Sequence, residues 1–391
     1  MNFLEKAQQL GLDVNALKNG QTIKATHTVN SLEEFKQLFA GNISPEQRSN
    51  FTKGAPLAVD TASANMNNLM HHVYGTHELS AADQAFANQV FPTKVGLTAA
   101  QDLTITQDMV FGPAGLPEVV TAETITFDGG SITAISTVLS LRADNVVVKS
   151  QGTKPYTVGL VGNKGQDGHI GTTGAPYTSA AKNGSNASAP SPGICTGASG
   201  GGNGSDGDQG NQGGRGGDGF NGQSNLPANI TINNYDTSSA QPFVVYTVSG
   251  AGGDGGQGGQ GGQGQNGGKG GNGCDSGCEG TDGGNGGKAG QGGNGGQGGN
   301  GGQGVDGNAI SISFPSSSKA SLMTTSDTAS PGAKGLGGPA GQAGSYGDAG
   351  SGGKHSNPGQ HGGGNTSGNN GPDGLAGTQS GKPGAFNIQY T

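Results

Sequence analysis

The chain has 391 residues, of which 84 are glycine, so about one position in five lacks a side chain that can fill a core. Hydrophobic residues make up 29% and charged residues 12%, against ~45–50% and ~25% in globular domains, which argues against an ordinary single-core domain and against a highly charged disordered chain. The 19 basic and 27 acidic residues give a net charge of −8, which argues against a nucleic-acid partner.

Residues 1–95 predict a small α-helical domain for attachment or oligomerisation. Ser31-Leu-Glu-Glu34 is a capping box, and Gly41 ends the helix that follows it. Ser44-Pro45 and Ser80 begin two further helices by the same logic.

Residues 96–156 predict a region of short β-strands, arranged as a solenoid or a sandwich. Apolar residues alternate with polar ones, and Asp128-Gly129-Gly130 reads as a turn between two strands. Similar short strands are expected later, each beside a glycine tract, at 230–232, 243–248, 309–314 and 386–390.

Residues 157–391 are dominated by glycine at every third position. The frame from Gly253 to Gly307 has 19 positions, of which only Gln265, Cys274 and Ala289 are not glycine. A three-residue period matches an extended helix with ~3.1 Å rise, and the lack of proline in 252–304 disfavours collagen. We therefore expect glycines such as Gly259 and Gly295 to lie where backbones approach closely, although disordered linkers remain an alternative.

The fold class expected from these zones is mixed. It comprises a small N-terminal α-helical domain, a short β-strand region, and a polyglycine-II helix bundle interleaved with short strands over residues 157–391.

The three cysteines are expected to have structural roles. Cys274 and Cys278 flank a segment that we interpret as a chain reversal, and their spacing allows a small disulfide loop. Cys195 could instead link two glycine tracts, and three free thiols remain a third alternative.

Catalytic and metal-binding motifs are weak. Gly197-Ala-Ser-Gly-Gly201 matches a nucleophile elbow only formally, because no apolar strand precedes it. Isolated calcium-type hexapeptides lack tandem partners, and His71, His72 and His77 lack suitably spaced further ligands. We expect no enzyme activity, no cofactor and no metal site.

The glycine repeat over residues 157–384, with Phe243–Val248 running directly into it, resembles the polyglycine-II proteins. It is most similar to the receptor-binding adhesins at the tips of phage long tail fibres, and more distantly to snow-flea antifreeze protein. The resemblance implies an N-terminal attachment domain and a rigid scaffold that presents loops.

The function expected is non-catalytic recognition of a cell-surface receptor or glycan by loops at the ends of the scaffold. Tyr177, His355 and His361 fall in breaks of the glycine period and are the candidate binding residues. The alternatives are a secreted or lysis-released toxin, possibly insecticidal, and a structural or ice-binding protein. The N-terminal domain would join a larger particle or a second copy.

The expected location is extracellular or virion-associated, with cytoplasmic accumulation before release as a further option. No apolar run approaches the ~18–20 residues that cross a bilayer, so no transmembrane segment is expected. The first residues also lack the basic and apolar stretches of a signal peptide.

Overall fold

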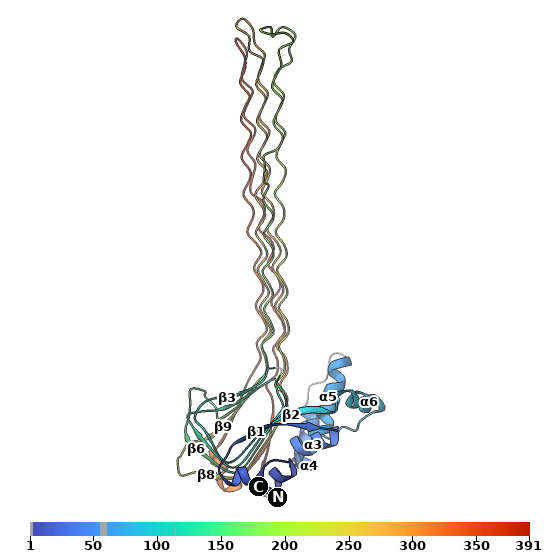
Figure 1. Ribbon diagram of the computed structural model, residues 1–391, viewed down its shortest axis with the longest axis vertical. Helices are drawn as coiled ribbons and strands as arrows, with labels where there is room; N and C mark the ends of the chain where they lie inside the picture. Colours follow the sequence, from blue (N-terminus) through green and yellow to red (C-terminus); the bar gives the residue numbers. More distant parts are fainter. Residues whose placement is uncertain (1–2, 55–60, 114) are drawn as a thin grey trace.

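The computed structural model describes residues 3–54, 61–113 and 115–391. The molecule is elongated, with a base of helices and strands at one end and a long, narrow shaft rising from it (Figure 1). Glycine-rich segments form the shaft, and the C-terminus returns to the base (Figure 1).

The α-helices of the described residues all precede Phe91. They are α1 (Phe3–Gln9), α2 (Val14–Lys18), α3 (Leu32–Ala40), α4 (Pro45–Gly54), α5 (Thr61–Tyr74) and α6 (Ala81–Val90). Ser31 caps α3 by accepting a hydrogen bond from the Glu34 N–H, and Ser80 caps α6 in a capping box with Asp83.

The strands form two sheets, and the chain passes back and forth between them. The seven-stranded sheet has the order β1 (Ile23–Val29), β2 (Thr93–Ile105), β4 (Glu118–Asp128), β6 (Leu139–Ser150), β8 (Ala228–Asp236), β10 (Ile310–Phe314) and β12 (Phe386–Tyr390). Its pairs are parallel except β1 with β2. The five-stranded sheet is parallel, with the order β11 (Leu322–Asp327), β9 (Phe243–Val248), β7 (Val158–Val161), β5 (Ile132–Ile135) and β3 (Met109–Phe111). A 3-10 helix, η1 (Ser316–Ser321), precedes β11.

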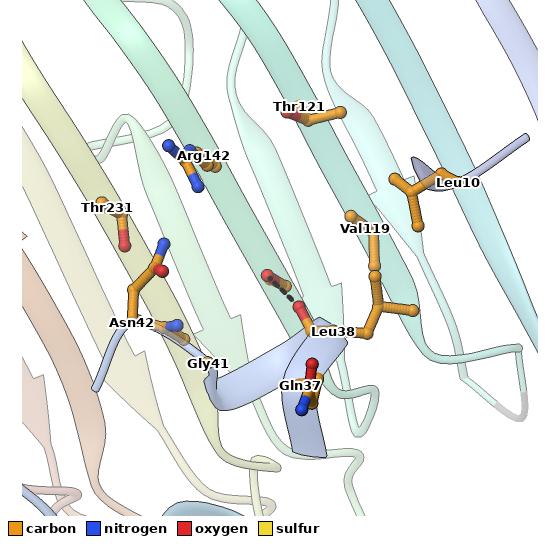
Figure 2. Close-up of a pocket in the computed structure, with 11 residues that line it drawn as sticks. Leu10, Gln37, Leu38, Gly41, Asn42, Val119, Thr121, Arg142 and Thr231 are labelled. Carbon is orange, nitrogen blue, oxygen red and sulfur yellow. Dashed lines mark hydrogen bonds between the residues drawn. The ribbon is translucent and has the colours of Figure 1, made fainter. Parts of the chain in front are cut away.

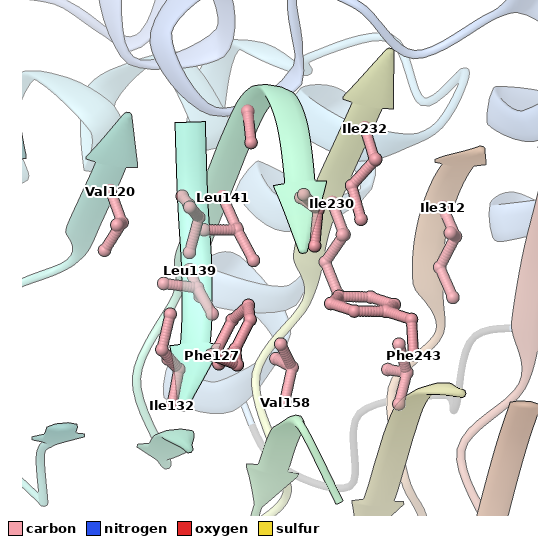
Figure 3. Packing of buried hydrophobic residues seen from close by; sticks show 14 of the residues in the cluster. Val120, Phe127, Ile132, Leu139, Leu141, Val158, Ile230, Ile232, Phe243 and Ile312 are labelled. Carbon is pink, nitrogen blue, oxygen red and sulfur yellow. The ribbon is translucent and has the colours of Figure 1, made fainter. Parts of the chain in front are cut away.

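The main hydrophobic core lies between the two sheets (Figure 3). Alternate residues of the large sheet, among them Leu139, Leu141 and Ile230, point into it and are fully buried. Val158 and Phe243 meet them from the smaller sheet. Strands β8, β10 and β12 thus share one core with strands that precede them by up to 290 residues.

The expected fold class is wrong. The regular secondary structure is an α/β arrangement of a mixed seven-stranded sheet and a parallel five-stranded sheet, and only 14% of the residues that the structure describes are helical. The β-structure is no short region, because strands lying between the glycine tracts pair with those of residues 93–161. Such pairing is non-local, so sequence periodicity could not reveal it. The strand β1 inside the helical zone was also not predicted.

The helices cover the outer face of the large sheet. Ser140 donates a hydrogen bond to the Leu38 carbonyl at 3.4 Å, and Asn229 donates to the Phe39 carbonyl at 3.1 Å. Gln47 of α4 donates to the carbonyls of Ile312 and Asn387 at 3.1 and 2.9 Å. Polar side chains on the sheet therefore donate to carbonyl groups at the C-terminal end of α3, which have no partner within the helix. The helices and the large sheet form one packed base.

The shaft consists of three long glycine hairpins, each inserted between a strand of the small sheet and the next strand of the large one (Figure 1). We call them the first (162–225), second (250–308) and third (330–385) hairpins, each with an outward and a return limb. Backbone hydrogen bonds recur every third residue, as from Gly256 to Gly217 and from Gly259 to Gly214. The three-residue period is therefore the period of the cross-links.

The second hairpin is central, which explains why two of every three residues in it are glycine. Its outward limb bonds to limbs of all three hairpins. A Cβ at Gly259 would overlap the carbonyl of Thr172, and one at Gly295 would overlap that of Gly338. Only glycine fits where carbonyls approach from two sides.

Asparagine and aspartate at the remaining positions join neighbouring limbs sideways. Asn285, Asn294 and Asn300 on the second hairpin each accept a hydrogen bond from a backbone N–H of the third, at 2.8–2.9 Å. These side chains accept from backbone N–H groups that have no partner in the glycine cross-links. Both backbone and side-chain hydrogen bonds therefore hold the shaft together.

Candidate binding site at the shaft tip

The three hairpins reverse at the far end of the shaft, where their turns meet (Figure 1). The turns comprise residues 188–200, 274–282 and 354–356. Isolated bridges pair Ser191 with Ile194 and Asp275 with Gly280, and the Ser356 N–H donates to the Gly353 carbonyl. The segment between Cys274 and Cys278 is thus part of a chain reversal.

A disulfide ties the first turn to the second. It joins Cys195 to Cys274, whose Cα atoms lie 5.8 Å apart across 79 residues of sequence. Cys278 is unpaired and exposed. Of the arrangements left open by the sequence, the structure has the link between two tracts and not the small loop.

A shallow hollow of about 320 Å³ lies among the three turns. Each turn contributes to its lining: Cys195, Thr196 and Ala198 from the first, Cys278, Glu279 and Thr281 from the second, and Lys354, His355 and Ser356 from the third. Most of these side chains are polar, so the hollow suits a ligand with hydrogen-bonding groups.

Polar contacts hold the rim of the hollow. Thr196 donates to the Glu279 carboxylate at 2.5 Å, which connects the first and second turns beside the disulfide. The Lys354 ammonium donates to the Gly277 carbonyl at 2.7 Å, and the backbone N–H of Lys354 donates to the Asp275 carboxylate at 3.0 Å. Side chains of opposite charge are therefore fixed within one small surface.

His355, one of the predicted binding residues, lies in this hollow with an exposed side chain. Its φ is 63°, in the left-handed region that non-glycine residues seldom adopt. Such a conformation costs free energy, and the rest of the third turn must hold the backbone of His355 in it.

The other two predicted binding residues do not lie at the tip. Tyr177 is on the outward limb of the first hairpin, well below the turn, and donates to the Gln209 carbonyl at 2.9 Å. His361 is on the return limb of the third hairpin, in ring contact with Tyr346 and 3.7 Å from the Asp348 carboxylate. Tyr177 lies where the regular cross-links of the shaft are interrupted, whereas His361 lies between Gly359 and Gly362, whose N–H groups keep the three-residue spacing.

Sequence reasoning missed Thr196 and Glu279 as site residues. Single polar residues in a turn have no periodic pattern, so only their place between two glycine tracts could have indicated them.

Two histidines of the helical part, His72 and His77, lie close to carboxylates. His72 Nε2 lies 2.8 Å from Glu33 Oε1, and His77 Nε2 lies 3.6 Å from Asp83 Oδ2. Hydrogen bonds from Ser80, and then from Asn68, lower the pKa of Asp83 to about 2. These contacts tie α3, α5 and α6 together.

Two cavities in the base offer little for chemistry. One of about 30 Å³ lies between the end of α3 and the large sheet, near Leu38 and Thr231, and has room for about one or two waters (Figure 2). The other, of about 220 Å³, lies between helices and sheet among apolar side chains such as Phe35 and Met70, and none of the described residues that line it is titratable.

No helix among the described residues is both long enough and apolar enough to cross a membrane. Comparisons with protein-family models, with curated proteins and with solved structures each found no match.

Proposed function

We propose that the protein is a non-catalytic recognition protein of the adhesin type, which presents its tip to a receptor or glycan on a cell surface. One observation carries the proposal: three turns far apart in the sequence form a single polar hollow at the end of the shaft, and a disulfide joins two of them. A site held in one shape loses little conformational freedom when it binds.

The shaft fits this role because it separates the tip from the base. A limb such as residues 250–273 rises about 3.1 Å per residue in an extended helix with three residues per turn, which places the tip roughly 70 Å from the sheets. Cross-links at every third residue oppose bending. In this proposal the helical base docks to a larger particle or to a second copy, and the protein acts outside the cell or on a virion.

Cell binding by fluorescently labelled protein tests the proposal. The test variant combines Glu279→Ala with Lys354→Ala, which removes both charges from the hollow. The control is Gln257→Ala, an exposed change on the shaft. We expect the tip variant to lose binding by about tenfold or more, which corresponds to about 1.4 kcal/mol or more from the two charged contacts with the receptor.

Equal binding by the tip variant and the unmodified protein would contradict a tip receptor site. Viability of the bound cells is measured in the same assay. Death of the cells that bind would favour the toxin alternative, whereas binding without death agrees with an adhesin.

A further inference from the structure

The shaft has a break in its lattice about halfway along the first hairpin. Gly174 donates to the Gln260 carbonyl, and the next cross-link of this limb runs from Ala181 to Asn266, both at 2.8 Å. Seven residues of one limb therefore stand opposite six of the other. The extra residue makes residues 175–180 bulge away from the second hairpin.

A second irregularity lies at the same level and holds the bulge in place. Gln265 occupies a position that is glycine in most repeats of the outward limb. Its side-chain amide donates to the Ser179 carbonyl at 3.3 Å and accepts from the Asp208 N–H at 3.1 Å. The bulge makes room for Gln265, and Gln265 fixes the bulge to two neighbouring limbs.

The bulge leaves a recess of about 150 Å³ against the outward limb of the second hairpin. Pro176, Tyr177 and Thr178 line one side, and Gln263 and Asn266 line the other. None of the described residues that line the recess carries a charge. The recess is therefore a small neutral site, unlike the charged hollow at the tip.

The side chains of the recess are held before any ligand arrives. The Tyr177 hydroxyl donates to the Gln209 carbonyl, which orients a ring that is 37% exposed. The side-chain oxygen of Asn266, Oδ1, accepts from the Ser345 N–H at 2.7 Å, so the side-chain NH₂ group is the part that can meet a ligand. Preorganised aromatic and amide groups favour binding because little rotamer freedom is lost.

We infer that this recess binds one neutral pyranose unit of a glycan. A sugar ring has an apolar C–H face, which packs against an aromatic ring, and an edge of hydroxyls that need amide and hydroxyl partners. Tyr177 and Pro176 supply the apolar wall, while Gln263, Asn266 and Thr178 supply the hydrogen-bonding groups. The absence of charge from the lining selects against phosphates and acidic sugars.

Saturation-transfer NMR and titration of the full-length protein with the methyl glycosides of glucose, galactose, mannose and N-acetylglucosamine test the inference. We expect transfer to the ring C–H protons of at least one sugar. Tyr177→Ala should weaken that binding about tenfold or more, whereas Tyr177→Phe, which keeps the ring, should weaken it less. Gln263→Ala should weaken it as well, and Gln257→Ala on the same limb is the matched control.

Three results would overturn the inference: no transfer to any of the four sugars, equal binding by Tyr177→Ala and the unmodified protein, or stronger binding of N-acetylneuraminic acid. Melting temperatures of all variants identify any loss of folding, and Tyr177→Phe and Gln263→Ala remain informative if Tyr177→Ala unfolds. Sugar binding that is lost in the Glu279→Ala, Lys354→Ala variant but kept in Tyr177→Ala would show that the sugar binds at the tip and not in the recess. The recess and the tip receptor site can therefore fail separately.

Discussion

At the scale of single residues, position in the three-residue period decides which substitutions the shaft tolerates. Gly259 and Gly295 face carbonyls of neighbouring limbs, whereas Gln260 and Gln297 are exposed. A side chain at the first pair must displace backbone, and a side chain at the second pair extends into solvent.

We expect Gly259→Val or Gly295→Val to destabilise the protein by about 3 kcal/mol or more, because overpacking against a fixed backbone has no flexible neighbour to relax it. Gln260→Lys and Gln297→Lys, the matched controls, should change stability by less than about 0.5 kcal/mol. Thermal unfolding measures both. Equal tolerance at the two kinds of position would show that the limbs are not packed in solution.

Asp83 gives the base a dependence on pH. Its pKa in the folded protein is lowered to about 2, chiefly by the hydrogen bond from Ser80, while the carboxylate of an unfolded chain has a pKa near 3.9. The charged form is therefore favoured by folding. Its contribution is complete above about pH 4 and is lost as the pH falls towards 2.

Asp83→Asn should remove roughly 2 kcal/mol of stability at neutral pH and flatten the fall in stability between about pH 4 and pH 2. Urea unfolding over this pH range checks the prediction. Asp102→Asn, at an exposed position of β2, is the control. A variant whose stability falls as steeply in acid as that of the unmodified protein would assign the acid sensitivity to other groups.

At the scale of elements, the turns at the tip lack the regular cross-links of the limbs. The first turn, residues 188–200, has few backbone bonds to the other hairpins, and the Cys195–Cys274 disulfide joins it to the second turn. The disulfide therefore matters more to the shape of the hollow than to the limbs below it.

The double variant Cys195→Ala, Cys274→Ala should increase hydrogen exchange in residues 188–200 while glycine amides near the base remain protected. A native disulfide contributes about 2–4 kcal/mol, and we expect that loss to be confined to the tip together with weaker cell binding. Cys278→Ser, at the unpaired cysteine, should leave the hydrogen exchange of residues 188–200 unchanged. Uniform loss of protection along the shaft would mean that the disulfide stabilises the whole lattice.

At the scale of the whole molecule, helices, sheets and shaft depend on one another. The helices bury Val95, Leu97 and Val119 on the outer face of the large sheet, and β1 pairs with β2 along seven residues. The sheets in turn set the register of the hairpins, since each hairpin begins and ends at a strand. Ordering the glycines of the shaft costs conformational entropy, and the packing of the base helps to offset that cost.

Removal of residues 1–92 should therefore leave a fragment that aggregates or melts well below the full chain, because it exposes apolar residues and the edge of β2. Light scattering and thermal unfolding measure the effect. Addition of residues 1–92 in trans should restore solubility if the helices act by covering the sheet. A soluble fragment with an unchanged melting temperature would show that the sheets fold without their cover.

Some local elements could be predicted because short-range physics specifies them. The capped helices after Ser31 and Ser80, and the short strands beside the glycine tracts, follow from side chains within a few residues of each other. The fold class could not be predicted in this way, because its two sheets join strands separated by whole hairpins.

The amino-acid sequence by itself determined the three-residue period of the glycine tracts and the reversal near Cys274, since both depend on residues close together in the chain. Only the tertiary structure decided that Cys195 pairs with Cys274, that His355 lies at the tip, and that Tyr177 lies beside a bulge well below it. The physical reason is that nearly identical repeats permit many registers locally. Pairing of distant strands in the base selects one of them.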